Sequence, residues 1–177
     1  NRGDCFSVLG VARELSVINN IKLNLPNISQ VQSSFKDNIQ VKACPQGPSY
    51  FGRTIRNISI NSKTLPLIAE RLRLSDQKLI DPVVDITNYI LLELGQPLHA
   101  FDRDKLNGNI HVRTALNKEK IKLLDDQELI LDETCLVISD KESAVAFAGI
   151  MGGKKSSVST STNSIFLESA FFKPSAI

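Results

Sequence analysis

Residues 81–102 read DPVVDITNYILLELGQPLHAFD, and they fix the expected local structure at the centre of the chain. Proline favours the first turn of a helix and glycine the position just past its end, so a helix is predicted from about Pro82 to Leu94, stopping at Gly95. Its apolar residues recur at helical spacing, which predicts a buried side. That side comprises Val83, Val84, Ile86, Ile90, Leu91 and Leu94. The residues after Gly95, which include His99, are expected to form a loop.

Two further helices are expected on the N-terminal side of this stretch. One follows Thr64 as a cap, with Pro66 in its first turn and an apolar stripe, and both central helices are expected to pack in the core. The other runs from Cys5 to Ile18 with Asp4 as its N-cap. Residues 19–38 are rich in Asn, Pro and Ser and are predicted to be a connecting segment.

The rest of the chain favours strands separated by Gly-, Asn- and Asp-containing turns. The predicted strands are residues 39–43, 50–60, 110–115, 121–124, 128–131, 136–139, 144–151 and 164–172. Helices flanked by strands, without regular alternation of the two, predict an α+β fold of layered β-sheets with helices packed on one side.

The segment boundaries predict two parts, residues 1–38 as the end of a preceding module with its linker, and residues 39–177 as a second module. The single methionine is Met151, so the chain does not begin with an initiator residue. We therefore expect it to be an excised piece of a longer protein.

Composition excludes several classes of protein. With 177 residues, 42% hydrophobic and 23% charged, the chain is expected to fold as a globular protein. A net charge of +2 is too small to indicate nucleic-acid binding by itself. Three cysteines without a Cys-x-x-Cys pair predict neither a disulfide framework nor a metal site, and they favour a reducing, cytoplasmic compartment. No stretch approaches the ~20 apolar residues of a membrane span.

Familiar catalytic motifs are absent or incomplete. Residues 149–156 read GIMGGKKS, which is one residue short of a phosphate-binding loop, and neither Gly-x-Ser-x-Gly nor His-Glu-x-x-His occurs. The tripeptide Arg2-Gly3-Asp4 matches a cell-adhesion motif, but three residues match by chance often, and Asp4 is already interpreted as a helix cap.

Glu168 is the most informative single residue. Strand alternation places it on one face with Phe166, Ala170 and Phe172, which is an apolar face. A carboxylate among aromatic rings is costly unless it finds a donor, and a ligand hydroxyl or amine can supply one that the protein lacks. The alternative is a solvated glutamate at a sheet edge, or one paired with Lys or Arg.

His99 and three glycines are weaker candidates. An imidazole on a rigid loop can orient a water molecule or donate to a developing oxyanion, but it can equally cap the turn or bind Asp102. Gly149, Gly152 and Gly153 mark places where a ligand could approach bare backbone, though a tight turn explains them as well.

Several stretches, in order and spacing, resemble the bacterial phenylalanyl-tRNA synthetase β subunit family. They are residues 81–102, Asn1–Cys5 with Ala12–Leu15, Cys44-Pro45 leading into Tyr50–Arg53, Ala148–Gly153 and Phe166–Phe172. The resemblance implies that residues 39–177 form the editing module, which hydrolyses tyrosine wrongly esterified to tRNA(Phe). A pocket for phenylalanine cannot strongly reject an analogue with one extra hydroxyl, so a second, hydrolytic site is needed.

The resemblance also implies roles for individual residues. Glu168 corresponds to the residue that recognises the tyrosine hydroxyl, and His99 to an editing-site residue that places the water or the terminal ribose. Gly149 and Gly152 correspond to the pocket lining, and Lys78 replaces an arginine that is common in relatives. The family's further pocket segment is expected just past Ile177, which implies a module truncated at its C-terminal end.

The resemblance implies tRNA(Phe) and a synthetase α subunit as partners, in an α2β2 assembly without a membrane. It implies no cofactor for this chain, because ATP and Mg²⁺ belong to aminoacylation in the intact ligase. A non-catalytic module that docks the tRNA or the α subunit remains the alternative.

Overall fold

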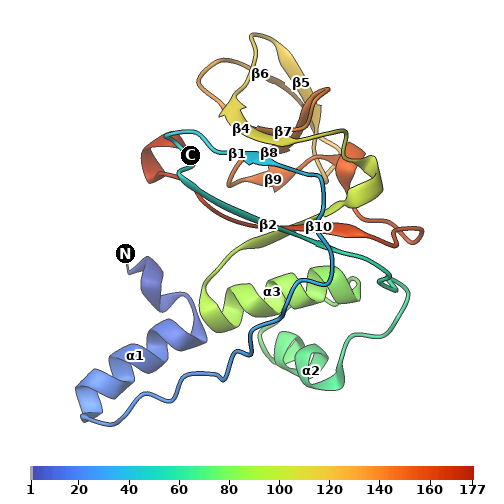
Figure 1. The fold of residues 1–177 in the computed structure, drawn as a ribbon. Coiled ribbons are helices and arrows are strands. Elements are labelled where there is room, and N and C mark those ends of the chain that lie inside the picture. The colour runs from blue at the N-terminus through green and yellow to red at the C-terminus, as the bar shows by residue number, and fades with distance from the viewer. Residues whose placement is uncertain (1) are drawn as a thin grey trace. The chain divides into compact units, whose positions relative to one another are not determined.

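A computed structural model of the chain describes residues 2–177, so Asn1 of the N-terminal motif lies outside the described residues. The described chain forms two compact units (Figure 1). One holds the residues up to Lys36 together with Lys63–Leu98, and the other holds Asp37–Ser62 with His99–Ile177. The two central helices thus share a unit with the N-terminal segment, and the module boundary near residue 38 stays a prediction.

In the first unit, the N-terminal helix begins later than expected. A short 3-10 turn at Gly3–Cys5 precedes helix α1, Val8–Asn19. Its N-cap is Ser7, whose Oγ accepts from the Gly10 amide at 3.0 Å, so the assignment of Asp4 as N-cap was wrong. The chain folds back, and the Asp4 carbonyl lies where a Cβ on Gly10 would be. Residues 21–40 contain no helix or strand, as expected of a connecting segment.

Helix α3, Pro82–Leu94, has the predicted bounds. The Asp81 carboxylate accepts from the amides of Val83 and Val84, and Gly95 ends the helix in the left-handed region at φ +80°.

Helix α2 spans Pro66–Leu74, but Thr64 does not cap it. The N-cap is Leu65, which makes no side-chain capping bond, while the Thr64 hydroxyl donates to buried Asp85 of α3. The cap prediction failed because a carboxylate that lies 21 residues further along the chain takes the hydroxyl.

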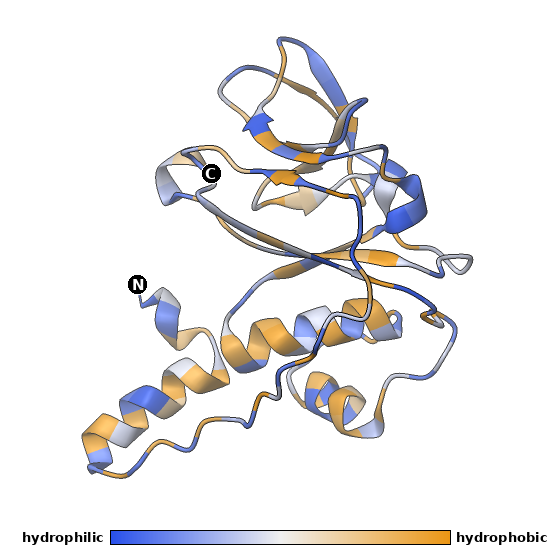
Figure 2. Ribbon diagram, in the orientation of Figure 1, coloured by the Kyte–Doolittle hydropathy of each residue, from blue (hydrophilic) through white to orange (hydrophobic). Residues whose placement is uncertain are grey.

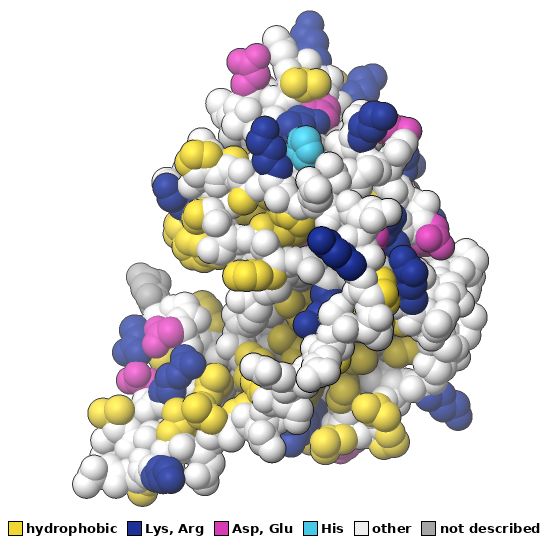
Figure 3. All heavy atoms as spheres, viewed as in Figure 1, with side chains coloured by type: hydrophobic (Ala, Val, Ile, Leu, Met, Phe, Trp, Pro, Cys, Tyr) yellow, Lys and Arg dark blue, Asp and Glu magenta, His cyan; other side chains and the backbone are white. Residues whose placement is uncertain are grey.

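The expectation that both helices pack in a core was wrong in part. In α2 only Leu72 is buried, and in α3 only Asp85. Ile86 and Leu91 of the predicted buried side are 44% and 41% exposed, and the other members are half-buried. The α3 ribbon is largely hydrophobic (Figure 2), and hydrophobic side chains lie on the visible surface of the helical unit (Figure 3). Helical spacing defines an apolar face but does not supply a covering surface.

The second unit is built from three sheets. A five-stranded sheet has the order β1-β4-β7-β8-β9, a three-stranded sheet the order β2-β10-β3, and β5 pairs with β6. The strands are β1 Val41–Lys42, β2 Ser49–Ile55, β3 Leu98–Asp102, β4 Ile110–Thr114, β5 Glu119–Lys122, β6 Glu128–Leu131, β7 Leu136–Ser139, β8 Ala144–Phe147, β9 Met151–Gly152 and β10 Ile165–Phe171. Helices and sheets together confirm the α+β class.

The strand predictions held in part, and the predicted strand at 50–60 ends early, as β2, Ser49–Ile55. β6 and β7 have the predicted bounds, whereas the predicted strand at 144–151 is two strands, β8 and β9, separated by a turn at Gly149. The loop predicted after α3 is strand β3, a correction that changes the setting of His99. Gly95 and Pro97 favour a loop at this point of the sequence, whereas β3 is a strand because β10 lies beside it.

The core of this unit brings the sheets together through two clusters of buried side chains. The larger cluster contains Phe101 of β3 and Phe166 of β10, with Tyr50 of β2 packed against it. The three-stranded sheet therefore turns one aromatic face into the core, and the predicted site residues of β3 and β10 belong to this region.

Candidate functional site

Glu168 lies inside the second unit. It belongs to β10, which pairs antiparallel with β2 (Figure 1), and strand alternation places it on the core-facing side with Phe166 and Ala170. Its side chain is only 7% exposed. The alternative of a solvated glutamate at a sheet edge is therefore wrong, and the predicted burial among apolar groups is what the structure shows.

A tyrosine side chain donates a hydrogen bond to Glu168. The Tyr50 hydroxyl donates to Glu168 Oε2 at 2.6 Å. In the β2–β10 register Tyr50 is opposite Ala170 and Glu168 is opposite Gly52, so the pair is a diagonal cross-strand contact. The carboxylate thus has an internal phenol as donor and not a lysine or arginine.

Burial dominates the electrostatics of this pair. It raises the pKa of Glu168 to about 7, and the hydrogen bond from Tyr50 opposes that rise. Burial, and next the negative charge of Glu168, raise the pKa of Tyr50 far above its ordinary value. The shared proton therefore stays on the tyrosine, and the carboxyl group changes charge near neutral pH.

Gly52 makes room for an aromatic ring beside this carboxylate. A Cβ built on Gly52 would lie 2.1 Å from Cζ of Phe166, so the ring covers the bare strand. Any side chain at this position would displace Phe166 and loosen the apolar packing that excludes water from the Glu168 carboxylate.

His99 lies on β3 and not on a loop. Its Nε2 is buried and has no hydrogen-bond partner within residues 2–177, and its ring packs edge-on against Phe101 with the centroids 4.5 Å apart. Burial alone lowers the pKa of His99 to about 4, so the imidazole is neutral at physiological pH. Asp102, considered as its partner, instead accepts from Thr162 and from the Asp104 amide.

We infer from strand register that His99 and Glu168 are neighbours. β3 and β10 are adjacent in the sheet, and the Arg103 amide donates to the Ser164 carbonyl at 2.9 Å just beyond both strands. Extending an antiparallel register from this bond places Phe101 opposite Phe166 and His99 opposite Glu168. Phe101 and Phe166 do share a core cluster, as that register requires.

Gly149 and Gly152 are each constrained to glycine by a different feature of the structure. A Cβ on Gly152 would lie 2.4 Å from Cε1 and 2.6 Å from Nε2 of His99, so the space over Gly152 holds the imidazole. Gly149 has φ +72°, a turn conformation that favours glycine, and a Cβ there would meet the Ile177 side chain at 2.7 Å. The structure thus brings Gly152 to His99, while Gly149 faces Ile177.

Lys78 belongs to the helical unit, where it is exposed between α2 and α3. The residues that share the sheet unit are Glu168, His99, Gly149 and Gly152. Of these, Glu168 and His99 have ionisable side chains, a core-facing carboxylate and an imidazole whose Nε2 has no partner among the described residues.

Two other features are weaker candidates. A cavity of about 550 Å³ is lined by Asn109, His111 and Arg113 among others, but Arg113 is already paired with Glu119 at 2.8 Å. This cavity contains none of the predicted residues.

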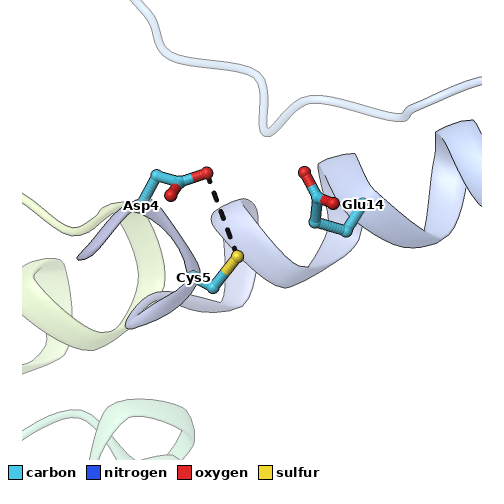
Figure 4. A group of neighbouring side chains, drawn as sticks. All are labelled: Asp4, Cys5 and Glu14. Carbon is cyan, nitrogen blue, oxygen red and sulfur yellow. Dashed lines mark hydrogen bonds between the residues drawn. The ribbon is translucent and has the colours of Figure 1, made fainter. Parts of the chain in front are cut away.

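Asp4, Cys5 and Glu14 come close enough for a metal ion (Figure 4). Arg2 already binds both carboxylates, at 2.6 and 2.7 Å, and the hydrogen bond from Arg2 lowers the pKa of Asp4 to about 2. The group is therefore an exposed ion network, and nothing in it points to a metal.

Sequence reasoning missed Tyr50 and Gly52. The strand containing them was predicted, but its partner strand and register were unknown. A tyrosine two residues from a glycine in a predicted strand was the available signal, because glycine within a strand often indicates close approach of another group.

None of the helices within the described residues is both long and apolar enough to cross a membrane. On the face seen in Figure 3, Lys and Arg side chains are interspersed with acidic ones. The visible face thus gives no independent indication of a nucleic-acid surface.

Comparison with known proteins agrees with the sequence resemblance. Residues 46–177 match the family model of the B3/4 domain. Phenylalanine–tRNA ligase β subunits from Idiomarina loihiensis and Coxiella burnetii are each 50% identical over 179 residues, which is the whole of this chain but 22% and 23% of those proteins. A β subunit from Legionella pneumophila strain Lens is 49% identical, also over the whole chain.

A solved N-terminal fragment of the phenylalanyl-tRNA synthetase β subunit from Pyrococcus horikoshii has the same fold. It matches with a TM-score of 0.58 and 19% identity over the whole of this chain and 55% of the fragment. This chain spans about a fifth of the length of its curated relatives. It belongs to the B3/4 domain family and is similar throughout to part of phenylalanine–tRNA ligase β subunits.

Proposed function

We propose that this chain carries the editing site of a phenylalanine–tRNA ligase β subunit and hydrolyses tyrosine esterified to tRNA(Phe). The observation that carries the proposal is Glu168, a buried carboxyl group with a phenol as its hydrogen-bond partner. A site built to accept a hydroxyl strongly disfavours the analogue that lacks it, because its own polar group is then left unpaired. Tyrosine would satisfy this carboxylate, and phenylalanine would not.

The reaction needs no cofactor from this chain. Water adds to the ester carbonyl carbon, the bond to the ribose oxygen breaks, and the proton from water ends on that oxygen, which frees tyrosine and tRNA. A neutral imidazole whose pKa is about 4 is a weak base, so His99 acts by orienting the water or a ribose hydroxyl through its unpartnered Nε2. Gly152 contributes by leaving room for that ring.

The proposal includes the partners of the whole ligase. These are tRNA(Phe) and an α subunit in an α2β2 assembly in the cytoplasm, with ATP and Mg²⁺ serving aminoacylation elsewhere in that assembly. Lys78 remains a proposed cationic contact and Gly149 a proposed part of the pocket wall.

The test is deacylation of tyrosyl-tRNA(Phe) by the full-length subunit in its ligase. Glu168→Ala and His99→Ala should each slow hydrolysis at least tenfold, which corresponds to losing about 1.4 kcal/mol of transition-state stabilisation. Matched controls are Glu133→Ala at an exposed glutamate and His111→Ala at the other histidine. Unchanged hydrolysis in both site variants would refute the proposal.

The second candidate is a non-catalytic docking module. Large apolar side chains on the helical unit favour it, since Phe6, Leu67 and Leu74 are 83%, 63% and 70% exposed. If hydrolysis is unaffected in the site variants, but substitution of these side chains weakens binding of tRNA(Phe) or the α subunit, docking replaces editing as the function.

A further inference from the structure

The carboxylate that recognises a phenol in the proposed function already binds one. Tyr50 donates to Oε2 of Glu168 at 2.6 Å, and it does so from a regular strand paired through its whole length with β10. Its ring also packs against the larger core cluster. Moving this ring away would open the core, so Tyr50 is a permanent partner of the carboxylate and not a mobile plug.

We propose that Tyr50 is a positioning residue that sets the specificity of Glu168, because its hydroxyl occupies Oε2 and directs a ligand phenol to Oε1. This inference rests on the proposed function. A carboxylate with free rotation in an apolar pocket could turn either oxygen to a ligand or to water, whereas a fixed donor on one oxygen defines where the second donor must lie.

The hydrogen bond also sets the charge of the group. A donor to the ionised form favours that form, so the Tyr50 hydroxyl counteracts the burial that raises the pKa of Glu168. An ionised carboxylate accepts only, and leaving one oxygen unpaired costs more for a charge than for a neutral acid. Discrimination between tyrosine and phenylalanine should therefore increase as pH rises through about 7.

Among the described residues, the ionisable groups that face this carboxylate lie on the two neighbouring strands. On the neighbouring strands they are Tyr50 of β2 and His99 of β3, and the imidazole is neutral across this pH range. Further along the same face, Thr54 donates to Asp37, which is held by Arg103 at 2.8 Å. The hydrogen bond from Arg103 is the main cause that holds the pKa of Asp37 far below neutrality, burial opposes it, and the hydrogen bond from Thr54 adds to it. Asp37 therefore does not titrate in the same pH range as Glu168.

The test is Tyr50→Phe in the full-length subunit within its ligase, measured as deacylation of tyrosyl- and phenylalanyl-tRNA(Phe) from pH 6 to 9. The expected result is about a tenfold smaller preference for the tyrosyl ester at pH 7.5, in the range of one hydrogen bond to a charged group, and a pH midpoint that moves upward. Tyr89→Phe is the matched control, because it removes the hydroxyl of the other tyrosine, which binds Arg71 in the helical unit.

Three results would overturn the inference. If Tyr50→Phe has the wild-type preference for the tyrosyl ester and the wild-type pH midpoint, Tyr50 does not position Glu168. The proposed function would still stand in that case, because the subunit would still hydrolyse the tyrosyl ester. Faster hydrolysis in Tyr50→Phe would show that Tyr50 blocks the site. The third result does not depend on hydrolysis: the carbon NMR signal of the labelled Glu168 carboxyl, identified by its loss in Glu168→Gln, is expected to titrate at higher pH in Tyr50→Phe, and an unchanged titration would overturn the inference.

Discussion

Replacing Glu168 by glutamine should stabilise the protein at high pH and not at low pH. Burial raises the pKa of Glu168 to about 7 from its ordinary 4.5, so the folded state retains a proton that the unfolded state loses. Between these two values the unfolded state holds fewer protons, and the free energy of unfolding therefore falls as pH rises. The stability associated with this group is fully present below pH 4.5 and is lost as pH passes through 7.

The size of the effect follows from the pKa difference. A shift of about 2.5 units at about 1.4 kcal/mol per unit gives a loss of about 3 kcal/mol by pH 8. Glutamine is nearly the same shape, its amide oxygen can accept from the Tyr50 hydroxyl, and it has no proton to lose. The stability of Glu168→Gln relative to wild type should therefore rise by about 3 kcal/mol between pH 4 and pH 8.

The assay is urea unfolding followed by circular dichroism at several pH values, with equal m-values as the check on two-state behaviour. Glu133→Gln, at an exposed position, makes the same change of charge without the burial. A stability difference between Glu168→Gln and wild type that is flat with pH, or that falls as pH rises, would refute the burial argument. It would also remove the physical basis of the proposed phenol recognition by Glu168.

Three other predictions follow from contacts in the same unit. Burial holds the pKa of His99 at about 4, below its ordinary 6.5, so the contribution of this group to the free energy of unfolding falls by about 3 kcal/mol as pH falls from 6.5 to 4; the stability of His99→Asn relative to wild type should rise by that amount over the same range in urea unfolding. Gly152→Ala should displace the His99 ring, lower stability by about 1–3 kcal/mol and slow deacylation of the tyrosyl ester, whereas unchanged hydrolysis would argue against a placing role for the imidazole. Arg103→Ala should leave the mostly buried Asp37 without its cation and lower the free energy of unfolding by about 3 kcal/mol at most, seen as a lower midpoint of thermal unfolding, with Arg73→Ala on the exposed face of α2 as the control.

Local signals predicted local structure well. The bounds of α3 follow from Asp81, Pro82 and Gly95, which act within one turn of the helix ends. Thr64 carried the same kind of signal as Asp81, yet its hydroxyl binds Asp85 across the fold. A cap prediction fails where a distant acceptor offers a better hydrogen bond, and sequence spacing does not reveal distant acceptors.

At the site, too, local patterns predicted well and long-range contacts did not. Alternation alone placed Glu168 on an apolar face, and the structure confirms its burial. The Tyr50 bond and the proximity of His99 both depend on which strands pair and in what register, and a one-residue shift would have moved every one of these side chains to the other face. Gly95 and Pro97 predicted a loop where strand β3 forms, so the setting of His99 was the largest error of the sequence analysis.

The directions of the two pKa shifts reveal what kind of site this is. If His99 and Glu168 formed an ion pair, the pKa of the carboxyl would be lowered and that of the imidazole raised. Both shifts run the other way, because burial favours the neutral form of each group. Between about pH 4.5 and 6.5 their effects on stability have opposite slopes and cancel, so wild type should show a plateau there that either single variant removes.

A site that is destabilised by its own buried groups can use that cost in recognition. Above pH 7 the ionised Glu168 keeps one internal donor, and a ligand phenol would supply a second. Binding of a tyrosyl ester should then recover part of the 3 kcal/mol or so that burial takes from the folded state, whereas a phenylalanyl ester would exclude water and recover none. The thermal stabilisation by a non-hydrolysable tyrosyl analogue should therefore be larger at pH 8 than at pH 5, and equal stabilisation at both would mean that the ligand does not reach the carboxylate.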